Sequence, residues 1–230
     1  MKVLGLDTSS AVLALGIIEE DKILADVKVK LEGNLSEVLW DVLNQTLRDL
    51  SLELKELSAL AYSIGPGSFT GLRVGLAFIK GLSFSTGIPI VPVPTLDALA
   101  SQVNLVKTLV IPLIDAKKDL VYSALYTNNI GTFQKISDYM LLPLDKMVEK
   151  IPQQALFILL EDENFRAKWN DLTAEKNILA KVITVLPSGV AVAKLGFEKF
   201  EKNQVADLSN LEPLYVSPLA FKTKKRARFD

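Results

Sequence analysis

The sequence predicts an α/β protein made of two related halves. Strand-like apolar runs alternate with helix-like segments along the chain. Each half opens with an apolar strand that ends in aspartate, at Asp7 and at Asp115, about 108 positions apart. The identity between the halves is poor, so the internal duplication is inferred from the order of elements, βββαβαβα in both.

The N-terminal half begins with three strand segments joined by short turns, which indicates an antiparallel meander. A helix follows, with Asn34 as its N-cap and Glu37 three residues later, as in a capping box. Strands and helices then alternate, with a glycine-rich turn, Gly65–Ser68, before the second helix. The expected segments are strands 3–7, 12–18 and 23–30, helix 35–50, strand 60–64, helix 70–85, strand 89–94, and helix 95–103 capped by Thr95.

The C-terminal half repeats this order less regularly. The expected segments are strands 109–115 and 120–126, a weaker strand 131–136, helix 143–150, strand 155–160, helix 164–172, strand 181–186, and helix 188–202 capped by Ser188. The order matches two ribonuclease H-like lobes, the arrangement of the actin, Hsp70 and sugar-kinase ATPases, which is a fold analogy and does not decide function. We expect an N-terminal lobe at 1–104, a smaller C-terminal lobe at 105–217 and a basic tail at 218–230.

The composition restricts the possible chemistry. The chain has 230 residues, of which 49% are hydrophobic and 23% charged, as in a folded globular protein. It contains no histidine and no cysteine. This excludes Ser-His-Asp and Cys-His nucleophiles, a histidine general base, zinc sites with Cys or His ligands, iron–sulfur clusters and disulfides. Carboxylate, lysine, hydroxyl or backbone chemistry remains, or no chemistry.

The charge is balanced overall but uneven along the chain. The net charge is −1, with 26 basic and 27 acidic residues, which does not favour a general nucleic-acid binder. The tail contains five basic residues and one acidic residue, a charge of +4, so the rest of the chain carries −5. Such a tail could contact phosphates, although basic tails are more often simply solvated. The sequence shows no 18-residue apolar run and no signal-peptide pattern, so we expect a cytoplasmic protein without a membrane segment.

Four polar side chains are candidates for a vestigial nucleotide cleft between the lobes: Asp7, Thr8, Ser9 and Asp115. In active ATPases of this fold a carboxylate and hydroxyls at these positions hold magnesium and phosphate oxygens. The alternative is a local turn in which these side chains bond their own backbone. Lys117 and its neighbours after Asp115 could equally form a solvated hairpin tip.

The glycine-rich segment 65–71, GPGSFTG, lies between a strand and a helix. Its backbone N–H groups could approach an anion, but the P-loop pattern GxxxxGK[ST] is absent. The alternative is a tight turn with close packing. Gly71 and Gly75 keep the start of the helix thin, so that another helix could come close.

The first helix has an unusually wide apolar face. Its apolar side chains cover about 200° of the circumference, about twice what an ordinary surface helix needs. Two sides of the helix must therefore be covered, one by its own sheet and the other by a helix of the same chain or by a partner protein. Trp40 lies at the edge of this face and is a residue type that anchors interfaces.

Four segments together resemble the bacterial TsaB (YeaZ) family, the dimerization subunit of the tRNA threonylcarbamoyladenosine biosynthesis complex. They are LGLDTSS at 4–10, SIGPGSFTGLRVGLAFIKGLSFSTGIPIVPVPTLDALA at 63–100, PLIDAKKDLVYSALY at 112–126 and EPLYVSP at 212–218. GPGSFTGLR in this context is a specific signal, whereas DTS alone would be weak. The stretch 127–211 matches mainly in layout.

The resemblance implies a non-catalytic subunit with no metal and no cofactor of its own. It implies pairing with the catalytic paralogue TsaD, which carries a histidine metal site, with the ATPase TsaE joining and tRNA contacted indirectly or through the basic tail. Alone, the chain would form a homodimer through the same helices, and any nucleotide and magnesium would belong to the complex interface. The first two helices supply the implied interface residues: Leu35, Val38, Leu39, Trp40, Val42, Leu43, Leu47, Gly71, Leu72, Gly75, Leu76 and Ile79.

The chain departs from the family pattern at two edges. Leu35 stands where the family usually has histidine, and Ser217 where it usually has arginine. An alternative hypothesis is an active ATPase or small-molecule kinase in which Asp7 and Asp115 hold magnesium. The lack of a recognisable adenosine loop in the C-terminal half argues against it. A glycoprotease is excluded because the chain has no histidine pair to bind zinc.

Overall fold

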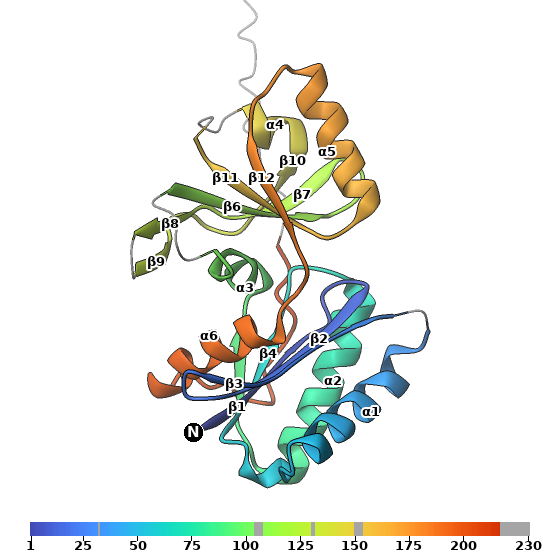
Figure 1. Ribbon diagram of the computed structural model, residues 1–230, viewed down its shortest axis with the longest axis vertical. Helices are drawn as coiled ribbons and strands as arrows, with labels where there is room; N and C mark the ends of the chain where they lie inside the picture. Colours follow the sequence, from blue (N-terminus) through green and yellow to red (C-terminus); the bar gives the residue numbers. More distant parts are fainter. Residues whose placement is uncertain (32, 104–107, 130–131, 150–153, 217–230) are drawn as a thin grey trace, which may run out of the picture.

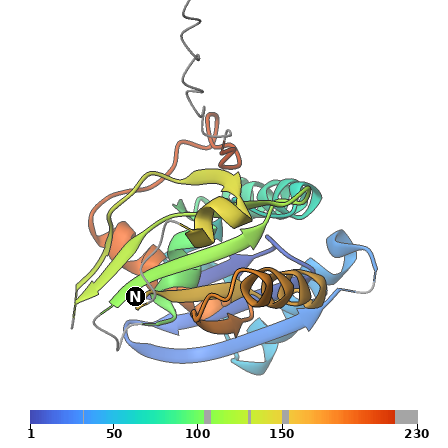
Figure 2. The same ribbon diagram turned by 90° about the horizontal axis from the view of Figure 1, so that it is seen from above.

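The computed structural model describes residues 1–31, 33–103, 108–129, 132–149 and 154–216. The chain forms two lobes, each built on one β-sheet, stacked along the long axis of the molecule (Figure 1). Viewed down that axis, the C-terminal lobe overlaps much of the N-terminal lobe (Figure 2).

The N-terminal sheet has the strand order β3-β2-β1-β4-β5. Its first three strands form the predicted antiparallel meander, and β4 and β5 join parallel to β1. β1 and β4 are almost entirely apolar because both faces of the sheet are covered. The strands are β1 (Lys2–Asp7), β2 (Val12–Glu19), β3 (Lys22–Lys30), β4 (Ala59–Ser63) and β5 (Ile90–Val93).

Helices α1 (Leu35–Asp49) and α2 (Phe69–Thr86) lie side by side on one face of this sheet, and a short 3-10 helix at Leu54–Glu56 follows α1 (Figure 1). Asn34 caps α1 as predicted, because its side chain accepts a hydrogen bond from the Ser36 N–H. The capping box is incomplete: the Glu37 carboxylate accepts from the Asn34 side-chain amide, 3.0 Å away.

The C-terminal sheet repeats the strand order of the first, which confirms the internal duplication. Its path is β10-β7-β6-β11-β12, so the first strand again lies in the middle with parallel strands on one side and antiparallel strands on the other. β8 pairs with β6 beyond the end of β7, and β9 pairs with β8. The strands are β6 (Thr108–Asp115), β7 (Leu120–Ser123), β8 (Tyr126–Asn129), β9 (Thr132–Lys135), β10 (Met140–Pro143), β11 (Leu156–Leu160) and β12 (Lys181–Val185).

Two helices accompany this sheet, α4 (Leu144–Glu149) and α5 (Glu163–Glu175). Phe165 and Trp169 on α5 are fully buried, and the Trp169 ring packs on Phe157 with 4.7 Å between ring centroids. These rings close a core that belongs to the second lobe alone.

The third helix of each half packs on the sheet of the other half, which corrects the expected domain division. α3 (Thr95–Ser101) packs against β6 and β11, whereas α6 (Gly189–Glu201) covers β1, β2 and β4. Both helices lie between the two sheets (Figure 1). Residues 105–217 are therefore not one separate lobe, because α6 and the segment after it belong to the N-terminal sheet by contact. The expected junction at 104 and the tail at 218–230 fall outside the described residues.

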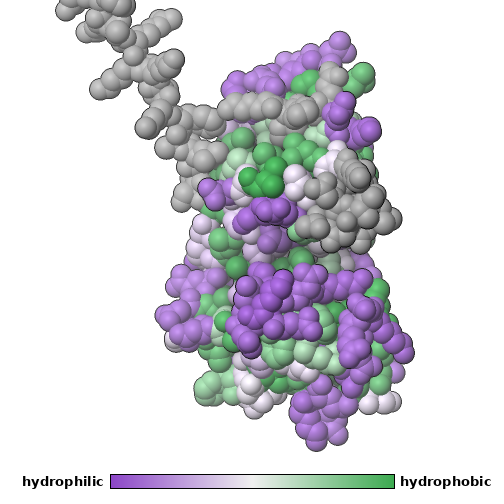
Figure 3. All heavy atoms as spheres, turned by 90° about the vertical axis from the view of Figure 1, so that its left-hand side faces the viewer, coloured by the Kyte–Doolittle hydropathy of each residue, from purple (hydrophilic) through white to green (hydrophobic). Residues whose placement is uncertain are grey.

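The start of α6 lies unusually close to the N-terminal sheet. A Cβ atom on Gly189 would overlap the backbone of Gly16 in β2, so only glycine fits there. Ser188 caps the helix as predicted, accepting a hydrogen bond from the Ala191 N–H at 3.1 Å. Viewed from the left-hand side of Figure 1, hydrophilic residues form a band across the middle of the molecule, and hydrophobic residues are exposed below it (Figure 3).

A partly buried polar cluster holds α3 to the C-terminal lobe. Asp97 on α3 accepts hydrogen bonds from the hydroxyls of Tyr126 at 2.7 Å and Tyr139 at 2.8 Å. Thr95 was expected to cap this helix, but it is the first helical residue and its hydroxyl bonds Ser63 instead, at 2.8 Å.

Candidate functional site

The first candidate site lies where β1 ends. Asp7, Thr8 and Ser9 are all buried, with at most 2% of each residue exposed. The glycine-rich loop closes over them, and the Ser68 N–H donates a 2.7 Å hydrogen bond to the Ser9 carbonyl. These side chains therefore do not line an open cleft in this structure, which corrects the expectation for Asp7, Thr8 and Ser9.

Hydroxyl groups seat α2 on the end of β1. Thr8 Oγ1 donates to the Gly71 carbonyl at 2.8 Å and lies 2.9 Å from the Tyr62 hydroxyl. The Tyr62 hydroxyl donates to the Leu72 carbonyl at 2.8 Å. A Cβ on Gly71 would overlap the Thr8 carbonyl oxygen, and one on Gly75 would overlap Thr8 Oγ1. The glycines therefore admit the chain's own Thr8, directly after β1, rather than a helix from another protein.

Asp7 is an ionisable group that the fold buries. Burial raises the pKa of its carboxyl above the usual range, although hydrogen bonds from Ser9 act in the opposite direction. Its Oδ1 accepts from the Ser9 N–H at 2.8 Å, which is the bond of an Asx turn. The local-turn interpretation of this segment accounts for the geometry.

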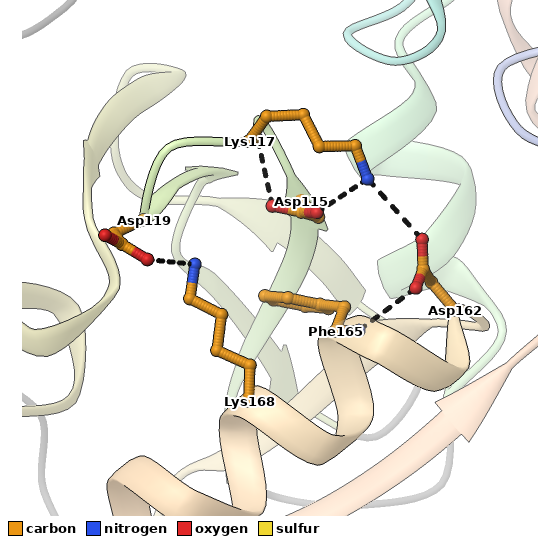
Figure 4. Close-up of polar contacts among 6 residues, drawn as sticks. All are labelled: Asp115, Lys117, Asp119, Asp162, Phe165 and Lys168. Atoms are coloured by element: carbon orange, nitrogen blue, oxygen red, sulfur yellow. Dashed lines mark hydrogen bonds and ion pairs between the residues drawn. The ribbon is translucent and has the colours of Figure 1, made fainter.

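Asp115 occupies the equivalent position at the end of β6 and is partly buried, with 15% of its side chain exposed. Its carboxylate accepts from the Lys117 N–H at 2.9 Å and from the Lys117 ammonium at 2.8 Å (Figure 4). The same ammonium lies 3.7 Å from Asp162, whose other oxygen caps α5 by accepting from the Phe165 N–H at 3.0 Å. The hydrogen bond to Asp115 raises the pKa of Lys117. The Asp115 edge is thus a solvated charge network that joins β6 to α5.

The structure does not connect the two aspartates. Within the described residues, no hydrogen bond or ion pair joins Asp7 and Asp115, and each is bound by its own local partners. No group of three or more acidic side chains in this part of the chain is arranged to hold a metal ion. The start of α2 fills the space beside Thr8, and Gly67 of the glycine-rich loop fills the space beside Ser9, so the residues present do not fit a phosphate or magnesium there.

The expected interface residues divide into three groups. Trp40 is 51% exposed. Leu35, Val38 and Val42 are partly buried against the N-terminal core. The remaining eight are enclosed by the chain's own sheet and helices, which corrects their assignment to a partner surface: Leu39, Leu43, Leu47, Gly71, Leu72, Gly75, Leu76 and Ile79. The wide apolar face of α1 is thus mostly covered within the chain, by β-strands below and α2 beside it.

The most exposed aromatic residue of α2 was not predicted from the sequence. Phe84 is 86% exposed, and Ala77 and Gly81 on the same side of the helix are also exposed. A helical projection of α2 would have placed Phe84 opposite Ile79, on the side that the sheet does not cover. We call Trp40, Ala77, Gly81 and Phe84 the α1–α2 outer surface.

Two further expectations concern regions beyond this site. The basic tail and Ser217 lie outside the described residues, so the structure does not describe a tail contact with tRNA. Within the described part of the chain, the helices are too short or too polar to cross a membrane.

Comparison with known proteins finds a matching family model and similar proteins of known name. The family model for TsaD, tRNA N6-adenosine threonylcarbamoyltransferase, matches residues 30–215. The chain is 28% identical over 219 residues to the tRNA threonylcarbamoyladenosine biosynthesis protein TsaB of Bacillus subtilis, covering 94% of both chains. It is 24% identical over 220 residues to TsaB of Escherichia coli, again covering 94% of both.

Solved structures confirm the fold class. YeaZ from Pseudomonas aeruginosa superposes with a TM-score of 0.77 at 20% identity, covering 93% of this chain and 100% of that one. The activator of 2-hydroxyisocaproyl-CoA dehydratase from Clostridium difficile, solved with bound ADPNP, gives a TM-score of 0.51 at 9% identity, covering 94% and 100%. Both likenesses concern the fold, the two-lobed actin-like ATPase architecture.

Proposed function

The chain belongs to the TsaB (YeaZ) family of tRNA threonylcarbamoyladenosine biosynthesis proteins, and from this premise we propose that it is a non-catalytic subunit of the modifying complex. In this role it pairs with the catalytic paralogue TsaD, with the ATPase TsaE, for threonylcarbamoylation of adenosine in tRNA. Alone, it pairs with a second copy through the same surface, as a quasi-symmetric paralogue interface permits.

The site chemistry supports a role without independent catalysis. The chain has no histidine, whereas the resemblance assigns a histidine metal site to TsaD. Asp7 is buried under the glycine-rich loop, and Asp115 is bound by Lys117. Neither carboxylate has the accessible, unoccupied geometry that phosphoryl transfer requires of a metal ligand.

The α1–α2 outer surface is the observation that carries the proposal. Trp40 and Phe84 lie on two helices that contact each other, and they are 51% and 86% exposed. Covering a large solvent-exposed ring with a partner lowers the free energy of the complex, and tryptophan is enriched among the residues that dominate binding energy. Ala77 and Gly81, on the same side of α2 as Phe84, are small enough to leave room for the backbone of an approaching helix.

Binding to purified TsaD tests the proposal, by size-exclusion chromatography and calorimetry at micromolar concentrations. Trp40→Asp and Phe84→Asp should each weaken the complex by about 30-fold or more, because a hot-spot residue contributes about 2 kcal/mol. Leu179→Asp is the matched control, since Leu179 is 81% exposed in the other lobe. Absence of a complex with the unmodified chain, or unchanged affinity in both variants, would reject the proposal.

A further inference from the structure

The α1–α2 outer surface is too small to be a complete interface. A stable protein interface buries about 800 Å² on each partner, whereas one large aromatic side chain buries about 150–250 Å². Trp40 and Phe84 are 51% and 86% exposed, so the two rings together supply about 300 Å². A partner that covers them must therefore cover a neighbouring part of the molecule as well.

The exposed residues of α1 do not extend this apolar surface. Apart from Trp40 they are polar or charged: Ser36, Glu37, Asp41, Gln45, Arg48 and Asp49. Charged residues are depleted from the centres of protein interfaces, and polar residues form the rims. The apolar surface therefore has to continue along α2.

The outward face of α2 is apolar over most of its length. Five exposed residues fall within an arc of about 120°, at about 100° per residue: Phe69, Arg73, Ala77, Gly81 and Phe84. Phe69 and Phe84 are separated by about 22 Å along the helix axis. The face thus has a ring near each end and small residues between the rings, where the backbone of another helix can approach.

Phe69 belongs to a second exposed aromatic group, at the start of α2. Phe69 and Tyr215 are each 55% exposed, with 6.2 Å between their ring centroids. The Arg73 guanidinium lies 3.7 Å from the centre of the Phe69 ring, and its Nε donates a 3.3 Å hydrogen bond to the Tyr215 hydroxyl. We call these three residues the Phe–Arg–Tyr cluster. Its two rings add about 200 Å² of exposed aromatic area to the face of α2.

The Tyr215 ring projects from a backbone that is fixed to the N-terminal lobe. Leu211 is buried in the same hydrophobic core as the inward side of α2, and the Leu214 N–H donates to the Ile64 carbonyl at 2.8 Å. Neither Phe69 nor Tyr215 belongs to a hydrophobic core in the described part of the chain. A partner would therefore meet two exposed rings that are already held in position, which reduces the entropy cost of binding.

Arg73 gives this end of α2 a positive charge without an acidic partner. Among the described residues, no carboxylate forms an ion pair with Arg73. The whole of α2 contains Arg73 and Lys80 but no acidic residue. A carboxylate on a partner would accept charge-assisted hydrogen bonds from the guanidinium. The complementary surface is therefore an apolar protein surface with an acidic residue at its edge.

The Phe–Arg–Tyr cluster lies where the two lobes meet. A cavity of about 100 Å³ beside it is lined from both lobes, by Leu72 of α2 and by Tyr122 of β7 among others. The start of α2 lies nearer the C-terminal lobe than its end does (Figure 1). A partner that extends along α2 as far as Phe69 therefore reaches the second lobe, whereas a partner on Trp40 and Phe84 need contact only the first.

We propose that the partner subunit which covers the α1–α2 outer surface also covers the Phe–Arg–Tyr cluster and places a carboxylate against Arg73. The proposal rests on the proposed function, in which this partner is TsaD. The interface then runs the length of α2 to the junction of the lobes. Phe69 and Tyr215 contact apolar side chains of the partner, and Arg73 both holds the two rings and pairs with the carboxylate.

Calorimetric titration of TsaD with variants of the full chain tests the two rings. Phe69→Ala and Tyr215→Ala should each weaken the complex by about 5-fold to 30-fold, the range between a measurable interface residue and a hot spot. Ile136→Ala is the matched control, because Ile136 is 50% exposed and follows β9 in the other lobe. Ring variants that bind TsaD as tightly as the unmodified chain would overturn the proposal.

The salt dependence of the same titration tests the carboxylate. Arg73→Gln should weaken the complex and make its affinity less sensitive to sodium chloride, because an ion pair at the edge of an interface is screened by salt. Arg166→Gln is the control, since it removes a positive charge from α5 and leaves the Phe–Arg–Tyr cluster intact. An Arg73→Gln complex with the salt dependence of the unmodified complex would contradict the assigned carboxylate.

Hydroxyl-radical footprinting with mass spectrometry detects the contact without any substitution. Adding TsaD should reduce the oxidation of Phe69 and Tyr215, as it should for Trp40 and Phe84, and leave the exposed Leu179 unchanged. Protection of Trp40 and Phe84 alone would overturn the extended interface and leave the proposed function standing. No protection at all, together with no complex by calorimetry, would reject the proposed function and this proposal with it.

A second copy of this chain is the competing occupant of the cluster. Analytical ultracentrifugation of the chain alone, with the same ring variants, distinguishes it from TsaD. A shift of the monomer–dimer equilibrium by Phe69→Ala and Tyr215→Ala, with TsaD affinity unchanged, would assign the cluster to a contact between copies and overturn the proposal. Weaker TsaD binding by both variants supports it.

Discussion

Gly75 allows α2 to sit on β1, and replacing it with alanine should destabilise the protein although alanine is the better helix former. A Cβ at this position would overlap Thr8 Oγ1 and lie 2.6 Å from the Tyr62 hydroxyl oxygen. The methyl group would therefore push apart two hydroxyls that lie 2.9 Å from each other. Tyr62 is fully buried, so its hydroxyl has no water to replace a missing partner.

The magnitude follows from three opposing contributions. Alanine in place of glycine gains about 1 kcal/mol inside a helix. Inserting a methyl group into a packed site costs about 1–3 kcal/mol, and leaving a buried hydroxyl or carbonyl unpaired costs about 1–3 kcal/mol more. We expect a net loss of about 3 kcal/mol in the free energy of unfolding for Gly75→Ala.

Gly81→Ala in the same helix is the matched control. A Cβ there would have no atom within 4 Å, so only the helix-propensity gain of about 1 kcal/mol should remain. Urea unfolding followed by circular dichroism measures both variants against the unmodified chain. If Gly75→Ala proves as stable as Gly81→Ala, the close seating of α2 on β1 is wrong.

Two further predictions concern buried polar groups. Burial raises the pKa of Asp7 above its ordinary 3.8, so its contribution to stability is full at low pH and is lost as the pH rises through the raised value. Asp7→Asn should remove this loss, so its free energy of unfolding in urea should vary less between pH 4 and 8 than that of the unmodified chain. Parallel pH profiles for the two proteins would contradict the burial argument. Tyr126→Phe removes a 2.7 Å hydrogen bond to Asp97 and should lower the free energy of unfolding by about 1.5–3 kcal/mol. Tyr139→Phe removes the other hydrogen bond to Asp97 and is the comparison; an unchanged free energy of unfolding in both variants would contradict the prediction.

The local structure was largely predictable because it depends on local chemistry. Alternating and continuous apolar runs indicated β1 to β5, and side-chain oxygens indicated the N-caps at Asn34 and Ser188. β10 was missed, since Met140–Pro143 is short and runs directly into α4, so Pro143 looked like the start of the helix. The exchange of α3 and α6 between sheets depends on long-range packing, which periodicity does not contain.

The proposed partner surface was harder to predict for a related reason. Leu39 and Trp40 are adjacent and both apolar, yet Leu39 is 1% exposed and Trp40 is 51% exposed. A wide apolar face indicates that two sides of a helix are covered, but which element covers each side depends on tertiary packing that the sequence pattern does not contain. The same limit applies to Gly75, whose missing side chain admits either a partner helix or, as found, Thr8.

The crossed position of α6 has a consequence for how the protein is made. The N-terminal sheet is covered on one face by helices that follow its own strands, but the other face needs Gly189–Glu201, which follows every strand of the second sheet. During synthesis that face therefore stays bare until the second sheet has also been made. Each half cut from the other would leave apolar strands without their covering helix, so we expect the two lobes to unfold together although their sheets repeat one strand order.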